Sequence, residues 1–299
     1  MRHYFLKTID IIKSISPKSV LSLIKYRVSI AVSFTGVTGY IVYTGHIDWN
    51  VLLVALGVFL FASGASGLNE VQEHKYDALM NRTKNRPIPT GQLSPHVAFI
   101  ISFWFIKAGF TILFLAFGII PALLGLLNIF WYNGVYTYLK RVSSFAVVPG
   151  SLVGAIPAFI GWTAAGGKMV DPTIIFIAFF LFIWQIPHFW LLMLKYGEEY
   201  KLAGFRTVNQ AIQAVNLKKI IFTWVVATSV ISITIPLYLT QLSWTFFALV
   251  FILNILFIGL FTSLSFGKSS ELNLKKSFIS INLYMMIFML MLIAFNLAI

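Results

Sequence analysis

The chain has 299 residues, of which 59% are hydrophobic and 10% are charged, and its formal net charge is +13. A soluble domain is about one quarter charged, so this composition indicates a chain embedded in lipid. The absence of cysteine excludes disulfides, thiolate zinc sites and cysteine-ligated iron–sulfur clusters. The basic residues lie in short loops between apolar runs, which favours topology signals over a nucleic-acid-binding surface, so we expect no nucleic-acid partner.

Nine apolar runs are each long enough to cross the hydrocarbon core as a helix, which takes about 20 residues. In chain order they cover residues 27–44, 51–70, 97–117, 119–139, 145–165, 174–195, 219–239, 244–265 and 278–298. No long segment alternates with a period of two residues, so strands are not expected. We predict an all-α integral membrane protein, with about nine transmembrane helices around a central cavity.

The basic residues are unevenly divided between the two sides of the membrane. Alternation of nine spans places 20 of the 22 on one side, since only Lys168 lies in the opposite loops and Lys107 lies inside the third run. The N-terminal segment alone contributes Arg2, Lys7, Lys13, Lys18, Lys25 and Arg27, and the last loop on that side begins with Lys268. By the positive-inside rule this side is cytoplasmic, which predicts a multi-pass protein of the cell inner membrane with a cytoplasmic N-terminus.

Acidic residues are scarce, yet several cluster at the cytoplasmic end of the second run. Asn69, Glu73 and Asp77 are four residues apart and share one face of a continued helix. Oxygen-bearing side chains of this kind suit Mg²⁺, which takes one or two carboxylates and fills its other positions with water and phosphate. A solvated loop of mixed charge is the competing interpretation, and Glu70 is expected to be a surface charge.

Basic residues follow this acidic stripe within a few positions. Arginine offers a bidentate fork to phosphate oxygens, so carboxylates followed by arginines suit a metal-bridged diphosphate. The candidate phosphate-binding residues are Arg82, Lys84 and Arg86.

A second polar group lies at the end of the sixth run, on the same predicted face of the membrane. Glu198 and Glu199 are candidates for a second metal site. His188 lies deeper, within the apolar run, where an ionisable residue is a functional candidate by default. An unbroken helix would align it with Lys195 and Glu199, so both His188 and Lys195 are candidates for binding substrate. A buried histidine bonded to a neighbouring helix is the alternative for His188.

Taken together, these residues resemble the UbiA superfamily of intramembrane prenyltransferases. The resemblance rests on Asn69, Glu73 and Asp77, followed by the Arg-Thr-x-x-Arg-Pro element from Arg82 to Pro87. Within the superfamily, the segments DALMNRTKNRPIPTG (77–91), VPGSLVGAIPAFIGWTAAGG (148–167) and IWQIPHFW (183–190) are most similar to the protohaem IX farnesyltransferases. The likeness extends over nearly the whole chain and implies a single domain over residues 1–299.

The resemblance implies Mg²⁺-assisted transfer of a farnesyl group from farnesyl diphosphate to a vinyl group of haem B, giving haem O. It implies metal binding by Asn69, Glu73 and Asp77, with Glu199 at the position of a family aspartate, and phosphate binding by Arg82 and Arg86. His188 is then a candidate for contacting haem. Membrane lipid surrounds the chain, and haem A synthase or a terminal oxidase assembly is the implied protein partner.

Two departures from the family pattern bear on this implication. Glu73 replaces the usual aspartate, and Phe205-Arg206-Thr207 replaces a Pro-Met-Leu-Pro-like run. They leave open a prenyltransferase with another acceptor, such as a hydroxybenzoate, naphthoate or chlorophyllide ring. A transporter with an ion site in the membrane is the alternative from another class.

Overall fold

The fold consists of long helices that run across the molecule and return. The computed structural model describes residues 16–239, 241, 243–266 and 273–298, so the predicted topology signals at Arg2, Lys7, Lys13 and Lys268 lie outside the described residues. In chain order the elements are α2 (Pro17–Leu23), α3 (Tyr26–Thr44), α4 (Trp49–Asp77), α5 (Pro95–Phe117), α6 (Ile119–Ile129), η1 (Phe130–Tyr136), α7 (Thr137–Val142), α8 (Val147–Gly150), α9 (Leu152–Ala164), α10 (Pro172–Leu202), α11 (Val208–Ala211), α12 (Ala214–Thr234), η2 (Ile235–Tyr238), α13 (Trp244–Phe266) and α14 (Leu274–Leu297).

The described part of the chain has eight helical spans long and apolar enough to cross a membrane, and a ninth if the bent pair α2–α3 counts as one. The prediction of an all-helical membrane protein with about nine spans is therefore confirmed. The third to ninth predicted runs match the observed spans to within a few residues at most ends. The largest differences are at α4 and α10, which continue seven residues beyond the predicted ends and carry the polar residues out of the apolar zone.

Helix ends follow local sequence signals. Asp48, Ser94 and Asp171 are N-caps whose side chains accept hydrogen bonds from the first backbone N–H groups of α4, α5 and α10. A proline follows two of these caps, in the first turn, where its missing N–H costs nothing. Gly45 ends α3 in the left-handed conformation, which glycine adopts without strain.

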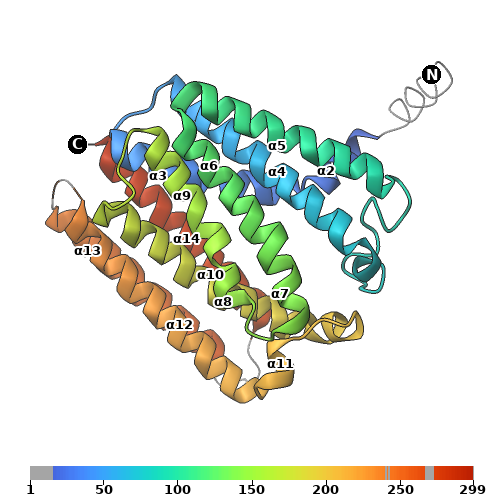
Figure 1. Cartoon of the computed structure of the whole chain (residues 1–299). Coiled ribbons are helices and arrows are strands. Elements are labelled where there is room, and N and C mark those ends of the chain that lie inside the picture. The colour runs from blue at the N-terminus through green and yellow to red at the C-terminus, as the bar shows by residue number, and fades with distance from the viewer. Residues whose placement is uncertain (1–15, 240, 242, 267–272, 299) are drawn as a thin grey trace.

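The two largest apolar cores of the described residues lie in different halves of the bundle. One is formed by α3, α4, α6 and α9, together with Leu113 of α5, and the other lies mainly among α10, α12, α13 and α14. Figure 1 shows α4 and α5 along one edge and α12 and α13 along the opposite edge, with α9, α10 and α14 between them. The polar ends of α4 and α10 meet between these two halves, because the backbone N–H of Arg82, beyond α4, donates to Glu199 of α10.

Candidate active site

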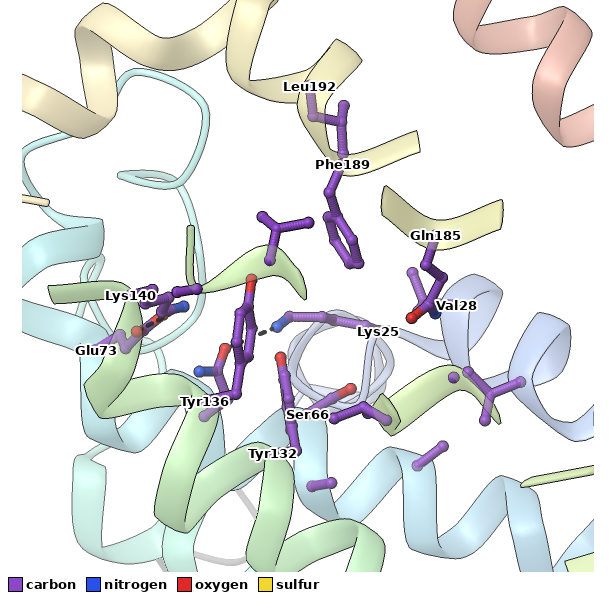
Figure 2. Close-up of a pocket in the computed structure, with 18 of the residues that line it drawn as sticks. Lys25, Val28, Ser66, Glu73, Tyr132, Tyr136, Lys140, Gln185, Phe189 and Leu192 are labelled. Atoms are coloured by element: carbon purple, nitrogen blue, oxygen red, sulfur yellow. Dashed lines mark hydrogen bonds and ion pairs between the residues drawn. The ribbon is translucent and has the colours of Figure 1, made fainter. Parts of the chain in front are cut away.

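A cavity of about 340 Å³ opens between the two halves of the bundle. Its wall is divided between charged and apolar side chains (Figure 2). The charged and amide part includes Lys25, Asn69, Glu73, Asp77, Arg82, Arg86, Lys140 and Arg206. The apolar part includes Val28, Val32, Val58, Phe61, Ile129, Val147, Phe189 and Leu192. Such a cavity can hold a ligand with an anionic head and a long hydrocarbon tail.

The predicted stripe on α4 forms part of the cavity wall. Asn69, Glu73 and Asp77 all line the cavity, and their exposed fractions are 2%, 4% and 0%. These values exclude the solvated loop as an explanation of the motif. The helix continues to Asp77, so the four-residue spacing keeps the three side chains on one face.

Each member of the stripe contacts a different basic residue. Lys25 Nζ donates to Asn69 Oδ1 at 3.3 Å. Lys140 Nζ lies 2.7 Å from the Glu73 carboxylate, and Arg86 Nη1 lies 2.7 Å from Asp77 Oδ2. Buried carboxylates are tolerated when they are paired in this way.

Lys25 and Lys140 could not be identified as site residues from the sequence, because each looks like one of the basic residues that flank membrane spans and set the topology. Lys25 lies at a 51° break between α2 and α3 and has a backbone φ of 46°. This left-handed conformation is uncommon for a residue with a side chain and marks a position held by its surroundings. Lys140 follows the π-helix η1, and such π-helical turns are frequent at functional sites.

The loop after α4 carries Arg86 back to the stripe. Thr83 donates its hydroxyl hydrogen to the Asp77 carbonyl, and the Ile88 N–H donates to Glu70 Oε1 at 3.2 Å. Glu70 has no exposed surface, so the expectation of a surface charge there was wrong. Burial opposes the charge on Arg86, but the nearby Asp77 and Glu70 carboxylates outweigh it and raise the pKa of this guanidinium above its ordinary value.

The second acidic pair divides into two different environments. Glu199 Oε2 accepts a hydrogen bond from the Arg82 backbone N–H at 3.1 Å, beside the bond of 2.6 Å from Arg82 Nη2 to the Tyr200 hydroxyl. The Glu198 side chain is 81% exposed and lies 3.9 Å from Lys201. Glu199 is therefore next to the cavity, where Arg82 and Tyr200 form part of the wall, whereas Glu198 faces away.

Three predicted substrate-binding residues lie outside the cavity wall. Lys84 is exposed and donates to Asn81 Oδ1 at 2.8 Å. Lys195 is exposed, with its ammonium over the ring of Tyr196. His188 packs between the rings of Trp184 and Phe278, at centroid distances of 4.9 and 4.8 Å. Its neighbour Phe189 lines the cavity instead. Lys107 is also exposed, and its ammonium lies over the ring of Trp104.

The segment Phe205-Arg206-Thr207, which follows α10 and departs from the family pattern, contributes both packing and charge. Phe205 is buried against the rings of Tyr76 and Tyr200, and the Lys140 ammonium lies 5.5 Å from its ring centroid. Arg206 lines the cavity and adds a cation there. Two residues of the departure from the family pattern, Phe205 and Arg206, therefore line the cavity.

The α4 stripe has donors that fit a magnesium ion. Asp77 Oδ1 is buried and has no hydrogen-bond partner among the described residues, and the Glu73 carboxylate and Asn69 amide line the same cavity. No group of three or more His, Asp or Glu side chains gathers as a metal site within the described part of the chain. The stripe therefore fits an ion that takes two carboxylates and completes its shell with phosphate and water.

Comparison with known protein families decides the family. The model of the UbiA prenyltransferase family matches residues 31–294, which is most of the chain. The chain belongs to this family. Among its relatives is the protoheme IX farnesyltransferase of Geobacter sulfurreducens, 39% identical over 62% of this chain and 68% of the relative. The protoheme IX farnesyltransferase of Aquifex aeolicus is 36% identical over 77% of this chain and 78% of the relative.

Solved structures of the family share the fold. A structure described as digeranylgeranylglyceryl phosphate synthase has a TM-score of 0.75 at 19% identity and covers 94% of this chain and 99% of its own. A UbiA homolog from Archaeoglobus fulgidus, bound to GPP and Mg²⁺, has a TM-score of 0.72 at 15% identity and covers 94% and 100%. At these identities the likeness establishes the helical architecture of the family.

Proposed function

We propose that this chain transfers a farnesyl group from farnesyl diphosphate to a vinyl group of haem B and so makes haem O. The observation that carries the proposal is the combination of a charged cavity end with a long apolar remainder, in a chain whose relatives are named protoheme IX farnesyltransferase. The charged end matches a diphosphate, and the apolar part matches a prenyl chain.

The cations of the cavity bind the donor diphosphate in this proposal. Arg82 and Arg86 were expected from the sequence, and the cavity adds Lys25, Lys140 and Arg206. Arg86 and Lys140 neutralise Asp77 and Glu73 in the structure. A bound diphosphate would offer its oxygens to these two cations instead, and the Asp77 and Glu73 carboxylates would then be free to hold Mg²⁺.

The difficult step is cleavage of the allylic C–O bond, because two electrons leave with the diphosphate. Asn69, Glu73 and Asp77 would hold Mg²⁺, which would supply positive charge that stabilises this leaving group. The surrounding arginines and lysines add fixed charge at the same place. The apolar wall keeps water from the allylic cation that remains.

The acceptor half of the reaction is addition to an alkene. The allylic carbon bonds to the terminal carbon of the haem vinyl group, which leaves a cation on the vinyl carbon next to the porphyrin ring. Water adds to that carbon and releases a proton, so the product carries a hydroxyethylfarnesyl group. His188 remains a proposed haem contact, but it lies outside the described cavity wall and packs against the ring of Phe278, so binding there requires this ring contact to open.

The decisive experiment incubates the purified full chain with farnesyl diphosphate, haem B and Mg²⁺. Mass spectrometry should show haem that has gained one farnesyl and one hydroxyl group, with no product when Mg²⁺ is removed by chelation. Prenylation of an aromatic acid with no prenylated haem would replace haem by another acceptor. Ion flux without any prenyl transfer would favour the transporter.

We further propose that the chain forms a single domain in the cell inner membrane, with the charged cavity end facing the cytoplasm. The support is the excess of basic residues on the side of the membrane where α4 and α10 end. A terminal oxidase assembly or haem A synthase is the proposed consumer of the product.

A further inference from the structure

The proposed function requires water to react at one carbon inside a mostly apolar cavity, and the present inference rests on that function. Once the farnesyl group is joined to the vinyl group, the cation next to the porphyrin ring has two fates. Water adds to it and gives an alcohol, or the adjacent carbon loses a proton and gives an alkene. The apolar wall excludes bulk water, so formation of the alcohol requires a polar group that holds a water molecule in the cavity.

The cavity wall contains amide side chains that suit this role. Apart from Asn69 of the α4 stripe, they are Asn128 of α6 and Gln185 of α10. The side-chain carbonyl oxygens of Asn128 and Gln185 are buried and have no hydrogen-bond partner among the described residues. A buried acceptor costs stability unless water or a ligand satisfies it, and lipid offers no donor. Each of these oxygens therefore indicates a site for a small polar molecule.

Gln185 lies where the charged and apolar parts of the cavity meet. It shares one face of α10 with Phe189, four residues later, and both line the cavity. Figure 2 shows the Gln185 side chain reaching from α10 toward the start of α3, where Lys25 lines the charged part and Val28 lines the apolar part. The reacting vinyl carbon belongs at this boundary, because it bonds to the carbon that leaves the diphosphate.

The adjacent helix α9 provides both room for the amide and a second acceptor. A Cβ atom on Gly154 would overlap Gln185 Nε2, so the absence of a side chain there makes space for the amide. Pro157 has no N–H, so the carbonyl of Val153, four residues earlier, lacks its helical donor. Val153 and Gly154 both line the cavity. A backbone acceptor therefore lies one residue from the glycine that the amide covers.

We propose that Gln185 holds the water molecule that adds to the vinyl-derived cation. Its amide oxygen accepts one hydrogen of the water molecule and the Val153 carbonyl accepts the other, which leaves a lone pair of the water oxygen free. That lone pair forms the new C–O bond, and the proton that is lost passes to the released diphosphate. Gln185 thereby decides whether the product is an alcohol or an alkene.

The test measures the ratio of alkene to alcohol in prenylated haem, using the full chain in lipid nanodiscs with farnesyl diphosphate, haem B and Mg²⁺. Gln185→Met keeps the length of the side chain and removes the amide. It should raise this ratio about tenfold, the order of effect expected from one hydrogen bond. Consumption of farnesyl diphosphate should stay near the parent rate, because C–O cleavage precedes the water step. Chromatography and mass spectrometry distinguish the products, since the alkene is lighter by one water molecule.

Gly154→Ala tests the same role without changing the amide itself. The added Cβ would displace the end of a flexible side chain, so the chain should fold and the ratio of alkene to alcohol should again rise. Gln213→Met is the matched control, since Gln213 is exposed before α12 and is not among the cavity-lining residues. Its product ratio should equal that of the parent chain.

A folded Gln185→Met variant with the parent ratio of products would overturn the proposal, and Gly154→Ala decides in the same way if Gln185→Met does not fold. A raised ratio in Asn128→Leu alone would also overturn it, because the water molecule would then be held by α6. Failure of the parent chain to prenylate haem would instead reject the proposed function.

Discussion

At the scale of single residues, the α4 stripe is a set of buried groups whose charges must be balanced. Asp77 is fully buried against Arg86. Removing one partner of a buried ion pair typically costs about 3–5 kcal/mol of folding stability, because the remaining charge is left uncompensated. If Asp77 were replaced by a residue of different size, a loss of activity could come from unfolding as well as from a lost catalytic group. A variant that keeps the shape of the Asp77 side chain is therefore preferable.

Asp77→Asn should reduce kcat by about 100-fold or more, because it removes a carboxylate from the proposed metal site, whose ion contributes several kcal/mol to the transition state. Steady-state assays of haem prenylation measure the loss, and size-exclusion chromatography checks that the chain remains folded. Asp171→Asn is the control, since Asp171 caps α10 and asparagine caps equally well. Turnover near the parent rate in Asp77→Asn would remove the metal role of this residue.

The second acidic pair predicts two different outcomes for adjacent residues. Glu199→Gln should lower kcat about tenfold, because a hydrogen bond to a charged group contributes roughly 1.5–3 kcal/mol and this one holds the Arg82 backbone. Glu198→Gln should stay within about twofold, since its side chain is 81% exposed and surface ion pairs contribute little. Both variants are measured side by side at saturating Mg²⁺. A larger loss in Glu198→Gln would place the second metal ligand there instead.

The sequence identified the stripe because a four-residue spacing is a property of the helix itself. It could not identify Lys25 or Lys140, since their roles depend on a backbone break and on a π-helix, neither of which leaves a periodic pattern. Glu70 was misjudged for a related reason. It lies off the stripe, and only the return of the loop at Ile88 shows why it is buried.

At the scale of helices, close packing in one pair depends on small residues. A Cβ atom on Gly161 of α9 would overlap the carbonyl oxygen of Gly36 on α3, and one on Gly39 would overlap that of Ala158. Small residues on both helices thus allow the backbones to approach, as is common in membranes. The spans were predictable from hydropathy, whereas this pairing was not, because small residues at helical spacing are frequent throughout the sequence.

Gly161→Ala should lower the free energy of unfolding by about 1–3 kcal/mol, the usual cost of overpacking. The matched control is Gly259→Ala on α13, where an added Cβ meets nothing within 4 Å; this change should be neutral or stabilise by about 0.5–1 kcal/mol, because alanine has the higher helix propensity. Thermal unfolding of both variants in detergent gives the comparison. A Tm for Gly161→Ala equal to that of the parent chain would show that α3 and α9 can separate without cost.

At the scale of the whole molecule, the two ends of the bundle carry different chemistry. At about 1.5 Å per residue, the 31 residues of α10 span roughly 46 Å, which exceeds the hydrocarbon thickness. The loop before α10 holds Lys168, and the end of α10 holds Glu199 beside the cavity. The orientation of the chain therefore decides from which compartment a water-soluble diphosphate group reaches the charged residues.

The absence of cysteine in the sequence makes this orientation directly measurable. Lys84 and Lys168 are exposed near opposite ends of the bundle, so Lys84→Cys and Lys168→Cys each introduce a single reactive thiol. If the basic side is cytoplasmic, a membrane-impermeant maleimide should label Lys168→Cys in right-side-out vesicles and Lys84→Cys in inverted ones. The reverse pattern would place the charged cavity end outside the cytoplasm. Farnesyl diphosphate would then have to reach the site from the outer face, so the orientation and the supply of the donor are tested together.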